Sequence, residues 1–157
     1  MKNLILALLF ALPLLAAADE GDTSVRYDLM INGLAAHTSS TFDGEKLNGF
    51  NPGIGLRISG GILDEDGAFS VGNYLNSFRR ETVFALYEYT PYHYKRLDFG
   101  VFGGVVTGYH SDEDAIDPLV AGVMTNVHLT DRAGLQVRFI PGNVSVFTFN
   151  VVYQLGK

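Results

Sequence analysis

The sequence contains no cysteine and no tryptophan, and only 5 of its 157 residues are proline. Without cysteine, disulfides are excluded, so a folded domain must be held by its core or by a sheet that closes on itself. Beyond the N-terminal segment there is no apolar run of about 20 residues, which excludes a transmembrane helix. Any aromatic girdle at a membrane interface must be built from the 8 tyrosines and 11 phenylalanines.

Positive charge is also scarce. The chain has 11 lysine and arginine residues against 17 aspartate and glutamate residues, and its formal net charge is −6 at pH 7. Nucleic-acid binding requires a basic stripe or patch. We therefore expect no nucleic-acid partner.

The N-terminal segment has the pattern of a secretory signal. Lys2 gives it a positive start, residues 4–15 are apolar, and three alanines at 16–18 precede Asp19. The apolar stretch is too short to cross a membrane, whereas the small residues fit a cleavage site. The sequence predicts a cleaved signal peptide over residues 1–18 and one exported domain over residues 19–157.

The exported part is organised as short segments in which apolar and polar residues alternate. The last segment shows this best, because Phe147, Phe149, Val151, Tyr153 and Leu155 share one face of an extended chain. Most segments have about the 9–11 residues that a tilted membrane strand needs. The predicted strands are Ser24–Asn32, Gly53–Gly61, Ala68–Asn76, Thr82–Thr90, Arg96–Thr107, Leu119–Leu129, Gly134–Ile140 and Val146–Leu155.

The lengths of the connections distinguish the two ends of the predicted sheet. Turn-rich links at 64–67, 90–95 and 130–133 are short, whereas the polar connections 33–52 and 108–118 are long. Short turns on one rim and long loops on the other are typical of transmembrane barrels. Composition alone fits a soluble β protein equally well, but the connections favour an all-β, eight-stranded, antiparallel up-and-down transmembrane barrel. We expect it in the bacterial outer membrane, as a monomer.

Strand parity places His37 and the pair Asn76-Ser77 on the same long-loop rim. A serine hydroxyl becomes a nucleophile when a neighbouring imidazole takes its proton. From the residues alone, ordinary solvated loop residues are the more frequent explanation of such a pair.

Several short motifs resemble those of the lipid A palmitoyltransferases, a family of small outer-membrane barrels often called PagP. Their order and spacing hold over most of the exported chain. The matching pieces are Asn51-Pro52-Gly53-Ile54-Gly55-Leu56, Gly72-Asn73-Tyr74-Leu75-Asn76-Ser77-Phe78, Ala85 and Tyr87, Gly103-Gly104-Val105-Val106-Thr107, Asp117-Pro118-Leu119 and Phe139-Ile140-Pro141-Gly142.

The resemblance implies transfer of an acyl chain from a phospholipid to lipid A. His37 and Ser77 match essential residues of the family, and Asn76 stands where the family has aspartate. A neutral amide does not stabilise an imidazolium as a carboxylate does, although it orients a ring. Membrane lipids, namely phospholipid and lipid A, are the partners that this resemblance implies.

Three further residues are candidates for lipid binding. Arg79 and Arg80 follow Ser77, and guanidinium groups match the geometry of lipid phosphates. Pro118 lacks a ladder donor and marks a candidate lateral gap through which lipid enters the barrel.

Charged residues are predicted to face the interior of the barrel. By parity, Glu88, Arg57 and Arg138 point inward. An unpaired charge in a dry cavity is expensive, so we expect Glu88 to pair with an arginine or with water. Such an interior favours a filled barrel or a short acyl pocket.

Two further functions remain open beside the acyltransferase. One is a non-catalytic barrel with structural or interaction roles, which Asn76 and Glu88 favour. The other is a lipid A deacylase that uses Ser77 and His37 with water as the acceptor. We expect no metal and no cofactor, because His93 and His128 lack ligand spacing and the acidic run 109–114 lacks the pattern of a calcium loop.

Overall fold

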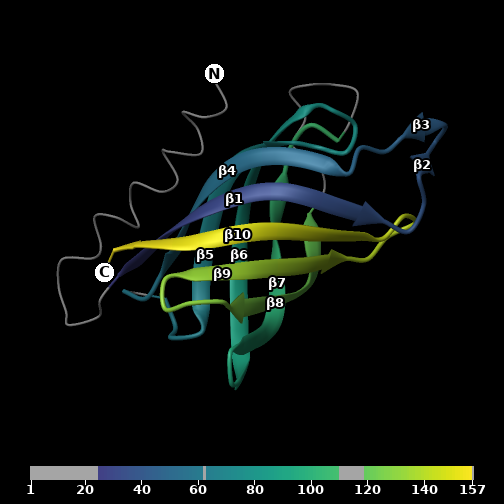
Figure 1. The fold of residues 1–157 in the computed structure, drawn as a ribbon. Coiled ribbons are helices and arrows are strands. Elements are labelled where there is room, and N and C mark those ends of the chain that lie inside the picture. The colour runs from purple at the N-terminus through teal and green to yellow at the C-terminus, as the bar shows by residue number, and fades with distance from the viewer. Residues whose placement is uncertain (1–24, 62, 110–118, 157) are drawn as a thin grey trace.

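The computed structural model describes residues 25–61, 63–109 and 119–156, which form a closed antiparallel β-barrel (Figure 1). Around the barrel the strand order is β1-β10-β9-β8-β7-β6-β5-β4, and β4 pairs with β1. This confirms the predicted eight-stranded, up-and-down architecture. The predicted signal peptide, residues 1–18, lies outside the described residues.

The barrel strands agree with the predicted segments except at their ends. They are β1 (Arg26–His37), β4 (Phe50–Ser59), β5 (Gly67–Leu75), β6 (Glu81–Tyr94), β7 (Leu97–Val106), β8 (Val120–His128), β9 (Ala133–Ile140) and β10 (Val146–Gly156). Two further short strands, β2 (Thr41–Phe42) and β3 (Glu45–Lys46), pair with each other in the connection after β1. The alternation pattern did not predict this hairpin.

Two strands, β1 and β6, continue well past their predicted ends because irregularities interrupt their pattern without ending them. In β1 the register shifts between Asn32 and Leu34, so the strand passes through a bulge at Gly33 and continues to His37. In β6 the shift lies between Tyr89 and Tyr92, around Pro91. Bulges and prolines disturb the apolar–polar alternation, which is why both segments resembled turns in the sequence.

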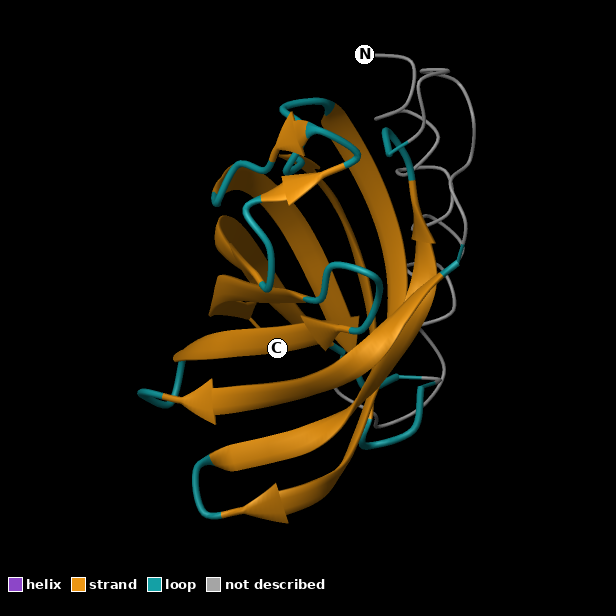
Figure 2. Ribbon diagram, turned by 90° about the vertical axis from the view of Figure 1, so that its right-hand side faces the viewer, coloured by secondary structure: helices purple, strands orange, loops and turns teal. Residues whose placement is uncertain are grey.

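The two rims of the barrel differ. The rim where β1 begins and β10 ends, here called the terminal rim, has the connections 60–66, 95–96 and 129–132. The opposite rim, here called the loop rim, has the connections 38–49, 76–80, 107–119 and 141–145. Figure 2 turns the loop rim toward the viewer, with the β2–β3 hairpin beside the end of the barrel.

The outer face of the barrel is apolar. The part of the chain that the structure describes contains no helix long and apolar enough to cross a membrane. Large hydrophobic side chains are exposed along the strands, where they alternate with buried side chains that face the interior. This is the surface of a barrel that lies in hydrocarbon. Examples of these exposed side chains are Ile31, Ile54, Tyr87, Tyr89, Val101, Val123, Phe147, Val151 and Tyr153.

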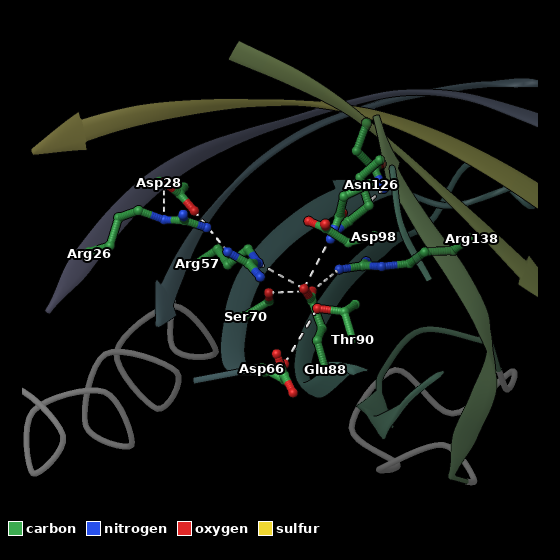
Figure 3. A network of polar contacts seen from close by, with 12 residues as sticks. Arg26, Asp28, Arg57, Asp66, Ser70, Glu88, Thr90, Asp98, Asn126 and Arg138 are labelled. Carbon is green, nitrogen blue, oxygen red and sulfur yellow. Dashed lines mark hydrogen bonds and ion pairs between the residues drawn. The ribbon is translucent and has the colours of Figure 1, made fainter. Parts of the chain in front are cut away.

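Half-way along the barrel, the interior is filled by an ion network around Glu88, which is fully buried (Figure 3). Its carboxylate accepts hydrogen bonds from Arg57 Nε at 2.8 Å, from Ser70 Oγ at 2.6 Å and from Arg138 Nη2. Arg57 Nη1 also donates to Asp28 at 2.9 Å. The predicted pairing of the inward Glu88 with arginine is therefore confirmed.

Above this network, toward the loop rim, the interior is apolar. Phe84, Leu86, Phe102 and Met124 form a buried cluster there. Two paired glycines make room for the Phe84 ring, because a Cβ at Gly72 would lie 2.8 Å from the ring carbon Cε1. The ion network thus separates an apolar half of the lumen from a polar half.

Glu88→Gln tests this arrangement. The substitution removes the charge shared by Arg57 and Arg138, and loss of one partner from a buried ion pair costs about 3–5 kcal/mol. We expect the free energy of unfolding, measured by urea titration in detergent micelles, to fall by this amount. Glu65→Gln is the matched control, because Glu65 is exposed on the terminal rim. A loss below about 1 kcal/mol for Glu88→Gln would contradict the network's role.

Candidate functional site

His37 and Ser77 meet at the loop rim. His37 is the last residue of β1, and Ser77 lies in the turn between β5 and β6. The distance from His37 Nε2 to Ser77 Oγ is 2.7 Å. Ser77 is buried and His37 is partly buried, so the hydrogen bond is partly shielded from bulk water. A neutral imidazole accepts the hydroxyl proton through Nε2 when its own proton is on Nδ1.

Asn76 builds the turn that presents Ser77. Its side chain is fully buried, and Nδ2 donates to Thr82 Oγ1 at 3.0 Å and to Gly108 O at 2.8 Å. Its Oδ1 accepts from the backbone N–H groups of Phe78 at 2.9 Å and Arg80 at 3.0 Å. These four hydrogen bonds occupy both N–H donors and both lone pairs of the Asn76 amide. The structure therefore does not bring Asn76 to His37.

The β2–β3 hairpin is attached to the same turn. The Phe42 and Phe78 rings pack edge to face with centroids 6.1 Å apart, and Asn48 N donates to Ser77 O at 2.8 Å. Glu45 forms an ion pair with Arg80 at 3.8 Å. The hairpin and the 76–80 turn consequently form one unit above the lumen.

A cavity of about 470 Å³ lies directly beneath this unit. His37 and Ser77 line its outer end and Arg138 lines it from the ion network. Its volume falls in the range of about 300–1,000 Å³ typical of small-molecule sites. Most of the wall is apolar and includes Phe84, Leu86, Phe102, Val106, Val120 and Ile140.

The strand ladder stops short of the loop rim at two places beside the cavity. Between β8 and β9 the pairing ends at Val123 and Phe139, although β8 begins at Val120. Between β4 and β5 it ends at Gly53 and Tyr74, next to Pro52. A bond from Asn51 Nδ2 to Leu75 O, 2.9 Å long, bridges the second gap. Pro118, the predicted gap marker, lies outside the described residues.

The two candidate phosphate ligands differ in their surroundings. The Arg79 side chain is exposed, and its backbone φ is 61°. Arg80 is engaged with Glu45, and its guanidinium carbon lies 5.9 Å from the centre of the Phe78 ring. Arg80 therefore holds the hairpin, whereas Arg79 projects from the turn.

The other two described histidines lie at the terminal rim. His93 is 2.8 Å from Asp66 and 2.8 Å from Asp98, and His128 is 2.5 Å from Asp98. These bonds join the connection before β5 to the rim ends of β6, β7 and β8. Within residues 25–61, 63–109 and 119–156, no group of three or more histidine, aspartate or glutamate side chains has a metal-binding arrangement. The acidic residues 110–114 lie outside those ranges.

Asn32 and Asn51 are two cavity residues that sequence reasoning missed. Asn51 opens one of the motifs quoted above, and Asn32 ends a predicted strand. Both side chains are buried and line the cavity. The only signal in the sequence was a polar residue on the inward face close to the loop rim.

No protein-family model matches this sequence, and no curated protein matches it. Among solved structures, a de novo designed transmembrane β-barrel is similar to the chain, with a TM-score of 0.59 and 12% identity over 83% of this chain and 95% of that chain. The outer membrane protein Ail of Yersinia pestis has a TM-score of 0.49 and 9% identity, over 84% of this chain and 100% of that chain. The likeness to the designed barrel supports the fold alone.

Asn76→Asp tests whether position 76 serves the turn or the histidine. A carboxylate lacks the two donors that now bond Thr82 and Gly108, and unsatisfied buried acceptors cost about 1–3 kcal/mol each. We expect a lower free energy of unfolding and no gain in any activity that depends on Ser77. A variant with higher activity and unchanged stability would instead assign Asn76 to His37. Asn143→Asp, which makes the same change at an exposed position of the loop rim, is the control.

Proposed function

We propose that this barrel is an acyltransferase of the bacterial outer membrane that moves an acyl chain from a phospholipid to lipid A. One observation carries the proposal: a histidine–serine pair, 2.7 Å apart, lies at the outer end of an apolar cavity of about 470 Å³. The pair supplies a base and a nucleophile, and the cavity offers an acyl chain an apolar environment. The motif resemblance supports the choice of donor and acceptor.

The chemistry requires two steps. In the first, His37 Nε2 takes the Ser77 proton as Oγ attacks the ester carbonyl of the phospholipid. The ester C–O bond breaks, and the leaving glycerol oxygen takes the proton from His37. In the second step a lipid A hydroxyl gives its proton to His37 and attacks the acyl-serine. The bond between the acyl carbon and Ser77 Oγ breaks, and Oγ takes the proton back from His37.

Within residues 25–61, 63–109 and 119–156, no carboxylate is hydrogen-bonded to the His37 ring. Among the described residues, Ser77 is the one side chain hydrogen-bonded to the His37 ring. A dyad stabilises the imidazolium less than a triad does, so the barrel is proposed to be a slow enzyme. The same observation favours a second candidate, a non-catalytic barrel that holds a lipid chain.

The ion network limits the acyl chain. Glu88, Arg57 and Arg138 fill the lumen below the cavity, and a chain that reached them would have to displace a buried, paired charge. The acyl group that fits is therefore short enough to end at Arg138. The gaps in the β4–β5 and β8–β9 ladders are the proposed routes for lipid, with Arg79 positioned to meet a phosphate at the rim.

Mass spectrometry of lipid A from cells that express the chain tests the proposal. We expect one added acyl chain with the wild type. His37→Ala should slow this transfer about 100-fold or more, the usual contribution of a general base, and Ser77→Ala should abolish it. Ser145→Ala is the matched control, because Ser145 lies on the same rim outside the cavity lining.

Other results would overturn the transferase. Loss of an acyl chain from lipid A that depends on Ser77 would identify a deacylase that uses water as the acceptor. Unchanged lipid A with a folded, membrane-inserted barrel would favour the non-catalytic candidate. Added chains that persist in Ser77→Ala would place the chemistry elsewhere in the molecule.

A further inference from the structure

The buried ion network ends on an arginine that lines the cavity. Ion pairs connect five charged side chains in alternating order, with an arginine at each end of the series (Figure 3). From the terminal rim toward the cavity they are Arg26, Asp28, Arg57, Glu88 and Arg138. The series therefore holds three positive charges against two negative ones, and a negative group beyond Arg138 would continue the alternation.

The two inner arginines are not equally paired. Arg57 bonds two carboxylates, through Nε to Glu88 and through Nη1 to Asp28. Arg138 bonds one, because within the described residues only its Nη2 donates a hydrogen bond, to Glu88. Among its three guanidinium nitrogens only Nε is both buried and without a partner, so Nη1 is exposed to the cavity that Arg138 lines. Arg138 thus presents an unused charged donor to the cavity.

Packing fixes the position of this donor. The guanidinium carbon of Arg138 lies 5.3 Å from the centre of the Phe102 ring, which also lines the cavity. A guanidinium stacks on an aromatic face in this way, and its bond to Glu88 holds it from the other side. Arg138 is itself more than nine-tenths buried, so a group that binds Nη1 is shielded from water. A cation in such surroundings favours an anionic partner, and its fork of N–H groups matches a carboxylate.

The rest of the wall selects the body of the ligand. Between the rim and Arg138 most of the cavity is lined by apolar side chains such as Phe84, Leu86, Val106 and Ile140. A small hydrated anion would leave this surface in contact with water, whereas an alkyl chain covers it. An alkyl chain whose methyl end reached Arg138 would leave the Nη1 donors without an acceptor. A carboxylate at the inner end of an alkyl chain satisfies both the apolar wall and the arginine.

We propose that the cavity binds a free fatty acid with its carboxylate on Arg138 and its alkyl tail directed toward the loop rim. This orientation is the reverse of that of an acyl chain esterified at Ser77. The inference uses the cavity and the ion network but not the histidine–serine chemistry. A fatty acid bound in this way fills the space that an acyl donor needs, and therefore competes with it.

Calorimetric titration of the full barrel, folded in phospholipid nanodiscs, tests the site. Decanoate and decan-1-ol have the same number of carbon atoms and differ in the group at the chain end. Both are titrated at about pH 9, where decanoate is ionised, and empty nanodiscs give the heat of partition into lipid. We expect decanoate to bind the wild type about tenfold more tightly than decan-1-ol, because a hydrogen bond between charged groups contributes more than one to a neutral hydroxyl.

Arg138→Gln removes the cation and keeps an amide donor for Glu88. We expect this variant to bind decanoate about tenfold more weakly than the wild type and decan-1-ol equally well. Arg132→Gln is the matched control, because Arg132 is exposed on the terminal rim and lies outside the cavity lining. If Arg138→Gln fails to fold, the affinities of the two ligands for the wild type decide the matter.

Intermolecular nuclear Overhauser effects on the wild type test the orientation. The methylene group next to the carboxylate should lie close to the Phe102 ring, and the methyl end close to His37. Contacts in the opposite order would overturn the proposed orientation.

The outcomes separate this site from the proposed acyl transfer. Equal affinity of decanoate and decan-1-ol for the wild type would overturn the site, as would binding of neither ligand or a preference that survives Arg138→Gln. Unchanged lipid A together with a decanoate preference that depends on Arg138 would remove the transferase and keep the site. Added acyl chains together with equal affinity for the two ligands would do the reverse.

Discussion

The burial of Glu88 is the constraint on which the rest of the lumen depends. An ionised carboxylate in the interior of a small barrel is tolerated only with full pairing, and Arg57, Arg138 and Ser70 approach it from three different strands. Because these partners come from β4, β5 and β9, the network links opposite walls of the barrel as well as neighbours. It also divides the interior, with charge and amide groups toward the terminal rim and an apolar cavity toward the loop rim.

At the loop rim, barrel strand β1 supplies His37, and the 76–80 turn and the β2–β3 hairpin complete the site. β1 carries His37 past the bulge at Gly33, while the turn after β5 presents Ser77 to it. The buried amide of Asn76 stabilises that turn through four hydrogen bonds. The β2–β3 hairpin then covers the cavity through the contacts of Phe42 and Asn48 with the same turn. The stability of this turn therefore also sets the geometry of the histidine–serine pair.

Much of the fold was predictable because a barrel strand repeats with a period of two. Alternation located all eight strands. Its main misses are the continuation of β1 past Gly33 and of β6 past Pro91, the early start of β4 at Phe50, and the two-residue strands β2 and β3. Parity also placed His37 and Ser77 on one rim and Glu88, Arg57 and Arg138 inside. It did not foresee that the Asn76 amide is fully bonded to Phe78, Arg80, Thr82 and Gly108. Nor did it foresee that Asn32 and Asn51 line the cavity, because cavity lining depends on neighbours distant in sequence.

The sequence by itself determined which side chains face hydrocarbon and which face the lumen, since that choice follows from alternation along each strand. It also indicated that the inward Glu88 needs an arginine or water beside it. Only the tertiary structure decided which partners meet, because the stagger of eight strands around a closed sheet sets the level of each inward side chain. That stagger places Arg138 beside Glu88, and it places Asn51 diagonally across from Asn32 on the neighbouring strand. The turn geometry beyond the ladder brings Ser77 Oγ to 2.7 Å from His37 Nε2.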